Sequence, residues 1–281
     1  MSERRRSQVA LVLCGSFNPL TYTHLRVLEM ARDQITSTSG VNVVGGLISP
    51  VHDEYSRQKD TLISSKHRVK MIRLTLSEQE DNWVQLWDWE VRQTGWKCTS
   101  EVLLESERVC RQLYGPTVRV MLVCGIDMLK KMADPECWDP VDVEYIVKKY
   151  GLLVHMRRGY DVEAVLQEFP EHYRQFIVLV PNTVHCEVSS TEIRSLTGRG
   201  LSTRYLLSDK VATYIKKNRL YRTSPRNSVA HPTLVGYTHI HSPRGSVVGY
   251  AHVSRGAGKL GVYTPPPRGG STGEYEESDV E

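Results

Sequence analysis

Apolar residues along the first 220 positions form short runs that alternate with longer segments of mixed polarity. The short runs are rich in Val, Leu and Ile, which favours buried strands. They cover 9–13, 41–48, 83–86, 118–123, 152–156 and 176–180. The mixed segments repeat apolar residues every three or four positions, as amphipathic helices do. They cover 21–33, 65–77, 96–114, 141–150, 161–168, 189–196 and 206–218.

Strands that alternate with helices in this way predict the α/β class, with a parallel sheet covered by helices on both faces in three layers. Right-handed crossovers place the loops that follow the strands on one edge of such a sheet. These loops contain 15–24, 49–59, 88–96, 125–127, Arg157 and 182–194. We therefore expect any chemistry of this domain at that edge.

The two ends of the chain differ from the domain between them. Residues 1–8 are short and basic, and we expect them to be flexible. From about residue 222 the chain is dominated by Gly, Pro, Ser and Arg and has few Leu, Ile or Phe to bury. Such a composition predicts a disordered tail over 222–281. The folded domain is expected to cover 9–221.

Composition excludes several classes of protein. The net charge of +4 is too small to argue for nucleic-acid binding. No apolar run approaches the roughly 20 residues of a membrane span, and the N-terminus lacks the apolar segment of a signal peptide. The six cysteines form no CxxC pair, which favours a reducing compartment without disulfides or zinc. We expect an intracellular protein of the cytoplasm or nucleus, and the mitochondrion stays open.

A glycine turn joins the first strand to the first helix. Gly15 ends the strand, and the segment from Ser16 through Phe17 to Pro19 has turn chemistry. Thr21 can cap the helix that follows, and His24 then lies in its first turn, where free N–H groups and the helix dipole attract anions. The pattern predicts a phosphate site. The plainer alternative is a strand end with an ordinary surface histidine.

A second helix start carries the same kind of chemistry. Ser189 and Ser190 are candidate caps, Thr191 follows, and Arg194 lies one turn later, where a guanidinium can bind phosphate bidentately. Taken alone, this is as well explained by a capped helix with a surface arginine. Two anion sites in separate parts of one chain suit a triphosphate better.

Several of these strings resemble motifs of one family. Gly15-Ser-Phe-Asn-Pro-Leu-Thr-Tyr-Thr-His24-Leu and Val188-Ser-Ser-Thr-Glu-Ile-Arg194 resemble two signatures of the nicotinamide mononucleotide adenylyltransferases, which are nucleotidyltransferases. Weaker matches lie in 89–99, in 124–127, at Trp138 and in 150–157. The resemblance spans about residues 9 to 221 and implies the Rossmann-like nucleotidyltransferase fold.

The resemblance also implies a reaction and a set of site residues. The enzyme would transfer AMP from ATP to nicotinamide mononucleotide, and to nicotinic acid mononucleotide as similar animal enzymes do, forming the dinucleotide and pyrophosphate. His24 and Arg194 would be catalytic. The ATP phosphates would meet Gly15, Ser16, Phe17, His24, Arg57, Lys59, Ser190, Thr191 and Arg194, with Lys59 favoured over Arg57. The mononucleotide would meet Trp96, Thr99, Gly125, Asp127, Trp138 and Arg157.

Tryptophans in such positions more often pack against a core, so this alternative stands beside the predicted contacts of Trp96 and Trp138 with the pyridine ring.

Mg²⁺ is expected on the phosphates and water, without protein ligands. The expected partners are ATP and the mononucleotide, with no nucleic acid, and a homo-oligomer stays open because family members commonly self-associate. Two rival functions remain: a sister nucleotidyltransferase with another phosphate acceptor, and a chaperone-like binding protein on the same fold.

Overall fold

The computed structural model describes residues 7–183 and 188–222, together with short strands inside the segment 223–281. The chain divides into two units, residues 1–222 and 223–281. Residues 1–6 of the predicted flexible N-terminus lie outside the described residues, and Gln8 already belongs to the first strand.

The first unit is built on a six-stranded sheet in which every strand pair is parallel. Its strands are β1 (Gln8–Gly15), β2 (Asn42–Pro50), β3 (Val84–Leu86), β4 (Arg119–Gly125), β5 (Leu152–His155) and β6 (Ile177–Val180). The spatial order β3-β2-β1-β4-β5-β6 reverses direction between β1 and β4. This is the doubly wound Rossmann-like order, in which ligands bind at that switch point. The predicted fold class is confirmed.

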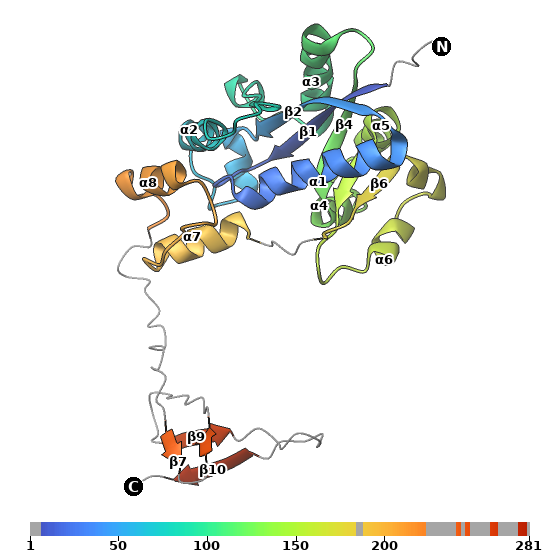
Figure 1. Ribbon diagram of the computed structural model, residues 1–281. Helices are drawn as coiled ribbons and strands as arrows, with labels where there is room; N and C mark the ends of the chain where they lie inside the picture. Colours follow the sequence, from blue (N-terminus) through green and yellow to red (C-terminus); the bar gives the residue numbers. More distant parts are fainter. Residues whose placement is uncertain are drawn as a thin grey trace. The chain divides into compact units, whose positions relative to one another are not determined.

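Helices cover both faces of the sheet (Figure 1). They are α1 (Tyr22–Ser39), α2 (Ser65–Leu76), α3 (Thr99–Tyr114), α4 (Ile126–Met132), α5 (Pro140–Tyr150), α6 (Val162–Gln167), α7 (Ser190–Gly198) and α8 (Asp209–Lys217). Three 3₁₀ helices join them: η1 (Asp53–Gln58), η2 (Glu90–Arg92) and η3 (Glu171–Phe176). The polar loop predicted over 49–59 therefore contains a helical turn.

Capping residues explain where two helices begin later than their apolar pattern. The pattern predicts a start at Trp96, but Cys98 caps α3, and Glu101 returns its carboxylate to the Cys98 N–H at 3.1 Å. Likewise α8 begins at Asp209 rather than near Leu206, because the Ser208 hydroxyl accepts from the Val211 N–H at 3.3 Å. Satisfying the free N–H groups of the first turn decides these boundaries.

Strand β1 lies at the centre of the core and is buried on both faces. Val9, Leu11 and Leu13 pack with α1, and Ala10 and Val12 pack with the α3–α5 side. A third cluster joins α2, α7 and α8 beside the sheet through Met71, Ile193, Leu207, Val211 and Ile215. The two-faced burial gives the near-continuous apolar runs that parallel strands show.

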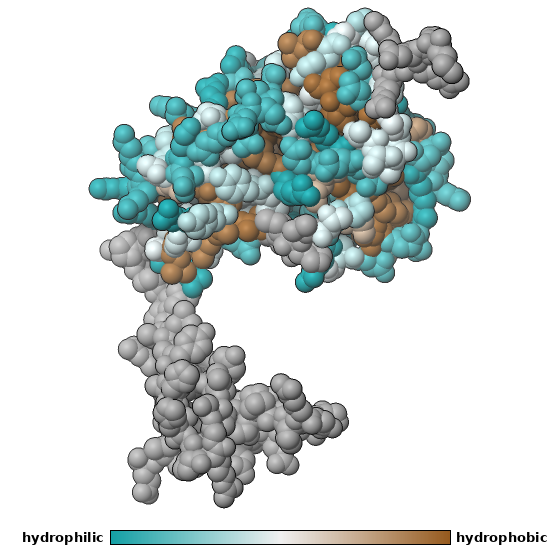
Figure 2. Space-filling model, viewed as in Figure 1, coloured by the Kyte–Doolittle hydropathy of each residue, from teal (hydrophilic) through white to brown (hydrophobic). Residues whose placement is uncertain are grey.

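The face of this unit seen in Figure 2 carries mostly hydrophilic residues, with smaller hydrophobic areas between them. In the part of the chain that the structure describes, no helix combines the length and the apolar character needed to cross a bilayer.

The second unit contains two antiparallel strand pairs among its described residues. Strand β7 (Ile240–Ser242) pairs with β8 (Gly245–Val247), and β9 (Lys259–Tyr263) pairs with β10 (Tyr275–Asp279). Most of the tail predicted to be disordered, 222–281, lies outside the described residues.

Candidate active site

The turn between β1 and α1, residues Gly15–Thr21, is compact and strained at one position. Phe17 is buried and has a backbone φ of 43°, which is uncommon for a residue with a side chain. Its ring lies over Gly15, where an added Cβ would come within 3.2 Å of the ring. A side chain at position 15 would therefore crowd the Phe17 ring where the strand turns toward the helix.

The side chain of His24 is fixed by the start of α1. Its Nδ1 accepts the Thr21 N–H at 3.1 Å and lies 2.8 Å from the Thr21 hydroxyl, and the Phe17 ring packs edge-on at 5.4 Å. Because Nδ1 accepts a hydrogen bond, the proton of the neutral ring is on Nε2. Burial lowers the pKa of His24 to about 4, and Arg157 and Lys59 act in the same direction. The histidine is thus a neutral Nε2–H donor.

A cavity of about 230 Å³ lies at the carboxyl ends of β1, β4 and β5, against the start of α7. It brings together eight predicted site residues from four separate segments: Gly15, Ser16, Phe17, His24, Gly125, Asp127, Arg157 and Ser190. This position is the switch point of the sheet. A wider groove of about 770 Å³ between α7 and α8 contains none of the predicted site residues.

The wall formed by β4 and β5 is polar. A nitrogen of Arg157 lies 3.5 Å from an Asp127 carboxylate oxygen. Gly125 makes room for that carboxylate, since an added Cβ would come within 2.5 Å of it. His155, which sequence reasoning missed, also lines the cavity and is the register partner of Gly125. The sequence offered one sign of this position: a histidine at the end of an otherwise apolar strand.

Lys59 reaches the turn from the loop after β2. Its Nζ donates to the Ser16 hydroxyl at 3.3 Å. Burial lowers the pKa of Lys59, and the nearby Arg194 guanidinium lowers it further. The repulsion between these two cations would be offset by an anion bound between them. The backbone of Arg57 belongs to η1, and its side chain lies outside the described residues.

Helix α7 holds the same turn from the other side. Arg194 donates to the Asn18 carbonyl at 2.9 Å and to the Thr191 hydroxyl at 3.1 Å, and the Ser190 hydroxyl donates to the Pro19 carbonyl at 2.8 Å. Ser189 is the cap of α7, and its hydroxyl accepts from the Glu192 N–H at 3.1 Å. The two predicted anion sites are therefore joined through the Gly15–Thr21 turn.

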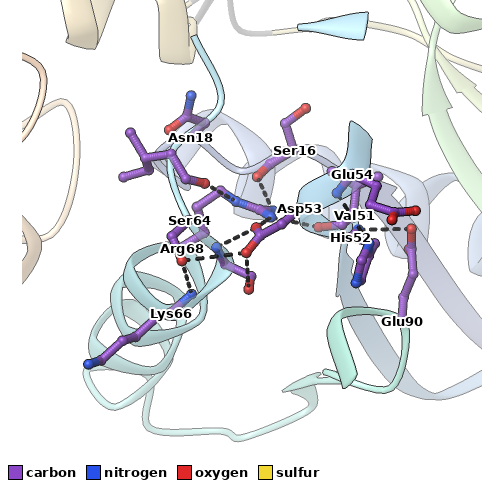
Figure 3. A network of polar contacts seen from close by, with 12 residues as sticks. Ser16, Asn18, Val51, His52, Asp53, Glu54, Ser64, Lys66, Arg68 and Glu90 are labelled. Atoms are coloured by element: carbon purple, nitrogen blue, oxygen red, sulfur yellow. Dashed lines mark hydrogen bonds and ion pairs between the residues drawn. The ribbon is translucent and has the colours of Figure 1, made fainter. Parts of the chain in front are cut away.

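Arg68 holds the backbone of the site, and the sequence analysis did not single it out. Its side chain is fully buried and donates to the carbonyls of Ser16 and Val51 at 3.0 and 2.7 Å and to Asp53 at 2.9 Å (Figure 3). Burial alone would raise the pKa of Asp53, but hydrogen bonds from Arg68 and Ser65 outweigh it and hold the pKa below its usual value. The sequence offered one sign of this role: Arg68 lies four residues before Ile72 and therefore shares the apolar face of α2.

Glu90 closes the same network behind the site. It is buried, and its carboxylate accepts the His52 N–H at 3.1 Å (Figure 3). Burial raises the pKa of Glu90 to about 7, although the His52 hydrogen bond and Arg68 favour the ionised form. The carboxyl group therefore titrates near neutral pH.

Three residues predicted to contact the mononucleotide lie outside the lining of the main cavity. The Trp96 side chain is exposed, and its backbone N–H donates to Glu54 at 3.2 Å. Thr99 begins α3. Trp138 packs beside the core and lines a separate cavity of about 130 Å³ with residues of α4, α5 and η3. Their contact with a substrate stays a prediction.

Comparisons with known proteins agree with this geometry. A family model described as cytidylyltransferase-like matches residues 12–196. The nicotinamide/nicotinic acid mononucleotide adenylyltransferase of Arabidopsis thaliana is 37% identical over 218 residues, covering 76% of this chain and 90% of that protein. The Schizosaccharomyces pombe protein of the same name is 35% identical over 225 residues. That match covers 76% of this chain, which spans 60% of the yeast protein's length.

A solved structure of the Plasmodium falciparum nicotinic acid mononucleotide adenylyltransferase complexed with APC has a TM-score of 0.55 and 19% identity. It covers 76% of this chain and 96% of that one, which supports the fold. The family match and the sequence identities lead to one assignment. The chain belongs to the cytidylyltransferase-like family and, within it, to the nicotinamide/nicotinic acid mononucleotide adenylyltransferases.

Proposed function

We propose that this protein transfers the AMP moiety of ATP to nicotinamide mononucleotide, and to nicotinic acid mononucleotide, with release of pyrophosphate. The observation that carries the proposal is a cradle of three side chains, His24, Lys59 and Arg194, at the switch point of the sheet. The neutral donor of His24, the amine of Lys59 and the guanidinium of Arg194 all meet the Gly15–Thr21 turn. These groups suit a polyphosphate, and the relatives at 35–37% identity carry the name of this activity.

The chemistry needs positioning and charge stabilisation rather than a base. The phosphate of the mononucleotide is already an anion, so it can attack the α-phosphorus of ATP in line while pyrophosphate leaves. The Nε2–H of His24 would donate to an oxygen that gains charge in the transition state. Lys59 and Arg194 would neutralise the leaving phosphates. A hydrogen bond to a charged group is worth about 1.5–3 kcal/mol, or roughly 10- to 100-fold in rate.

The mononucleotide side is proposed to use the wall of β4 and β5. The Asp127 carboxylate can accept ribose or amide hydrogen bonds, and Arg157 holds that carboxylate at 3.5 Å. Trp96 and Trp138 would stack on the pyridine ring, and Thr99 would contact its amide. A base stacked on an aromatic side chain gains about 1–3 kcal/mol, and a cationic ring adds attraction to the indole face.

The site also fits a magnesium–nucleotide substrate. Among the described residues, no three or more His, Cys, Asp or Glu side chains are grouped as metal ligands, and the cavity is lined by donors such as the His24 ring and the Arg157 guanidinium beside the single carboxylate of Asp127. As Mg²⁺ in nucleotide sites is commonly held by phosphate oxygens and water, we expect it there, where it would lower the charge of the leaving pyrophosphate. The chain's own residues would grip the phosphates that carry it.

Pyrophosphate release from ATP tests the proposal against its rivals. We expect release with either pyridine mononucleotide and none with pantetheine phosphate or FMN. Release with one of these other acceptors alone would identify a sister nucleotidyltransferase. No release with any acceptor would leave a binding role, such as a chaperone-like one, and would overturn the proposed enzyme.

A further inference from the structure

Asn18 lies at the centre of the Gly15–Thr21 turn and is fully buried. Its side-chain amide donates to the Thr61 carbonyl at 2.8 Å, and its backbone carbonyl accepts from Arg194 at 2.9 Å. Its side-chain oxygen, Oδ1, accepts from the hydroxyl of Tyr221 at 2.8 Å. Tyr221 lies 203 positions away in the sequence, yet it completes the hydrogen bonds of this one residue.

The backbone near Tyr221 is left-handed at two residues. Tyr221 follows the end of α8, and both Arg219 and Tyr221 have positive φ values, 53° and 60°. Such conformations cost energy in residues with side chains and persist where the surroundings over-determine them. Here the surroundings include the cluster of α2, α7 and α8, against which Tyr221 packs. The strain is thus offset by a defined packing position.

The hydroxyl of Tyr221 stays protonated in this position. Burial raises the pKa of Tyr221, while Arg194 and Arg68 oppose the shift. A neutral phenol is the form that can donate to Asn18. The same residue therefore adjoins two of the cations that shape the phosphate site.

We propose that Tyr221 is a positioning residue for adenylyl transfer, holding the Gly15–Thr21 turn in register with Arg194 and with the loop of Lys59 through the side chain of Asn18. The inference rests on the proposed function and concerns the same site. Thr61 lies two residues after Lys59, so the amide of Asn18 ties the lysine loop to the turn.

Loss of the Tyr221 hydroxyl leaves the Oδ1 of Asn18 buried without a donor. A 180° flip of the amide would not relieve this cost, because Oδ1 would then face the Thr61 carbonyl, which is also an acceptor. Relaxation around the unpaired amide therefore moves the turn relative to Lys59 and Arg194. A displacement of about 1 Å in a catalytic arrangement can cost on the order of 100-fold in rate.

The test compares Y221F with Y214F in the full-length protein. Tyr214 is a matched control because its hydroxyl also makes one 2.8 Å hydrogen bond, to His67 between α8 and α2. We expect Y221F to lower kcat by about 10- to 100-fold, with the KM for the mononucleotide within about threefold of wild type. We expect Y214F to keep the wild-type kcat, and the two variants to have similar Tm values. Equal kcat values for the two variants would overturn the positioning role.

A second variant removes the other partner of the same hydrogen bond. N18A removes the acceptor and leaves Tyr221 in place, and we expect a comparable loss of kcat. Adding Y221F to N18A should then change kcat by less than about twofold, because the two substitutions remove the same hydrogen bond. Full additivity would contradict the proposal. Wild-type protein without pyrophosphate release would instead count against the proposed function alone.

Discussion

At the scale of single residues, sequence reasoning predicted the local structure around His24 but not its electrostatics. The spacing of Gly15, Thr21 and His24 indicates a capped helix with a histidine in its first turn, and the structure has that arrangement. The protonation of His24 follows from the Thr21 N–H at its Nδ1 and from burial in the cavity, which only the fold creates.

The first prediction concerns the charge of His24. Because burial lowers the pKa of His24 to about 4, the ring of the unliganded protein should stay neutral from about pH 5.5 to about pH 8. NMR titration of ring-labelled histidine measures this directly, with H24A identifying the resonance. A midpoint near the ordinary value of about 6.5 would mean that an imidazolium, not a neutral donor, meets the phosphates.

The choice between Lys59 and Arg57 can also be tested at this scale. Lys59 touches Ser16 in the turn, so K59A should raise the KM for ATP by about 10-fold through loss of a charged contact. R57A removes an equal charge from the same loop and is the matched control, with an expected change below about twofold. Steady-state kinetics with varied ATP measure both, and the reverse order would assign the phosphate contact to Arg57.

At the scale of elements, the helices and strands followed from the apolar pattern, while their connections did not. The run over 65–77 predicts α2, yet nothing in its periodicity shows that Arg68 bonds the carbonyls of Ser16 and Val51 after β1 and β2. Those contacts depend on which strand ends become neighbours. The order of the sheet, rather than any local sequence, supplies that information.

Glu90 in η2 gives an element-scale prediction about stability and pH. Burial raises its pKa to about 7, so between pH 4.5 and 7 the folded chain keeps a proton that the unfolded chain has lost. Its contribution to stability is present at low pH and is lost as pH rises through 7. E90Q abolishes this titration.

The free energy of unfolding of E90Q, taken relative to wild type, should therefore rise by about 3 kcal/mol between pH 4.5 and about pH 8. Urea unfolding at several pH values measures the difference. E54Q serves as control, because the side chain of Glu54 is exposed whereas that of Glu90 is buried. A difference that stays flat with pH would show that Glu90 is ionised at its ordinary pKa.

At the scale of the whole molecule, alternating strands and helices were sufficient to predict that distant loops share one edge. Residues after β1, β4 and β5 and at the start of α7 do line one cavity. The same reasoning could not decide whether Trp138 faces that cavity or the core, since an indole suits both. In the structure it lines a second cavity between α4, α5 and η3.

The role of Trp138 has a kinetic test. If its ring stacks on the pyridine, W138A should raise the KM for the mononucleotide by about 10-fold and the KM for ATP by much less, since stacking is worth about 1–3 kcal/mol. W83A controls for the loss of a tryptophan packed against the core, because Trp83 bonds Glu29 beside β3. Equal rises in both KM values would mean that Trp138 is a packing residue.

Tracing the α-phosphorus of ATP tests the central claim most directly. Wild-type protein with α-³²P-labelled ATP and nicotinamide mononucleotide should place the label in the dinucleotide. H24A, with an unchanged circular dichroism spectrum, should do so about 100- to 1,000-fold more slowly. Label that stays in ATP or appears in free AMP, or an H24A variant as fast as wild type, would contradict adenylyl transfer within the cradle of His24, Lys59 and Arg194.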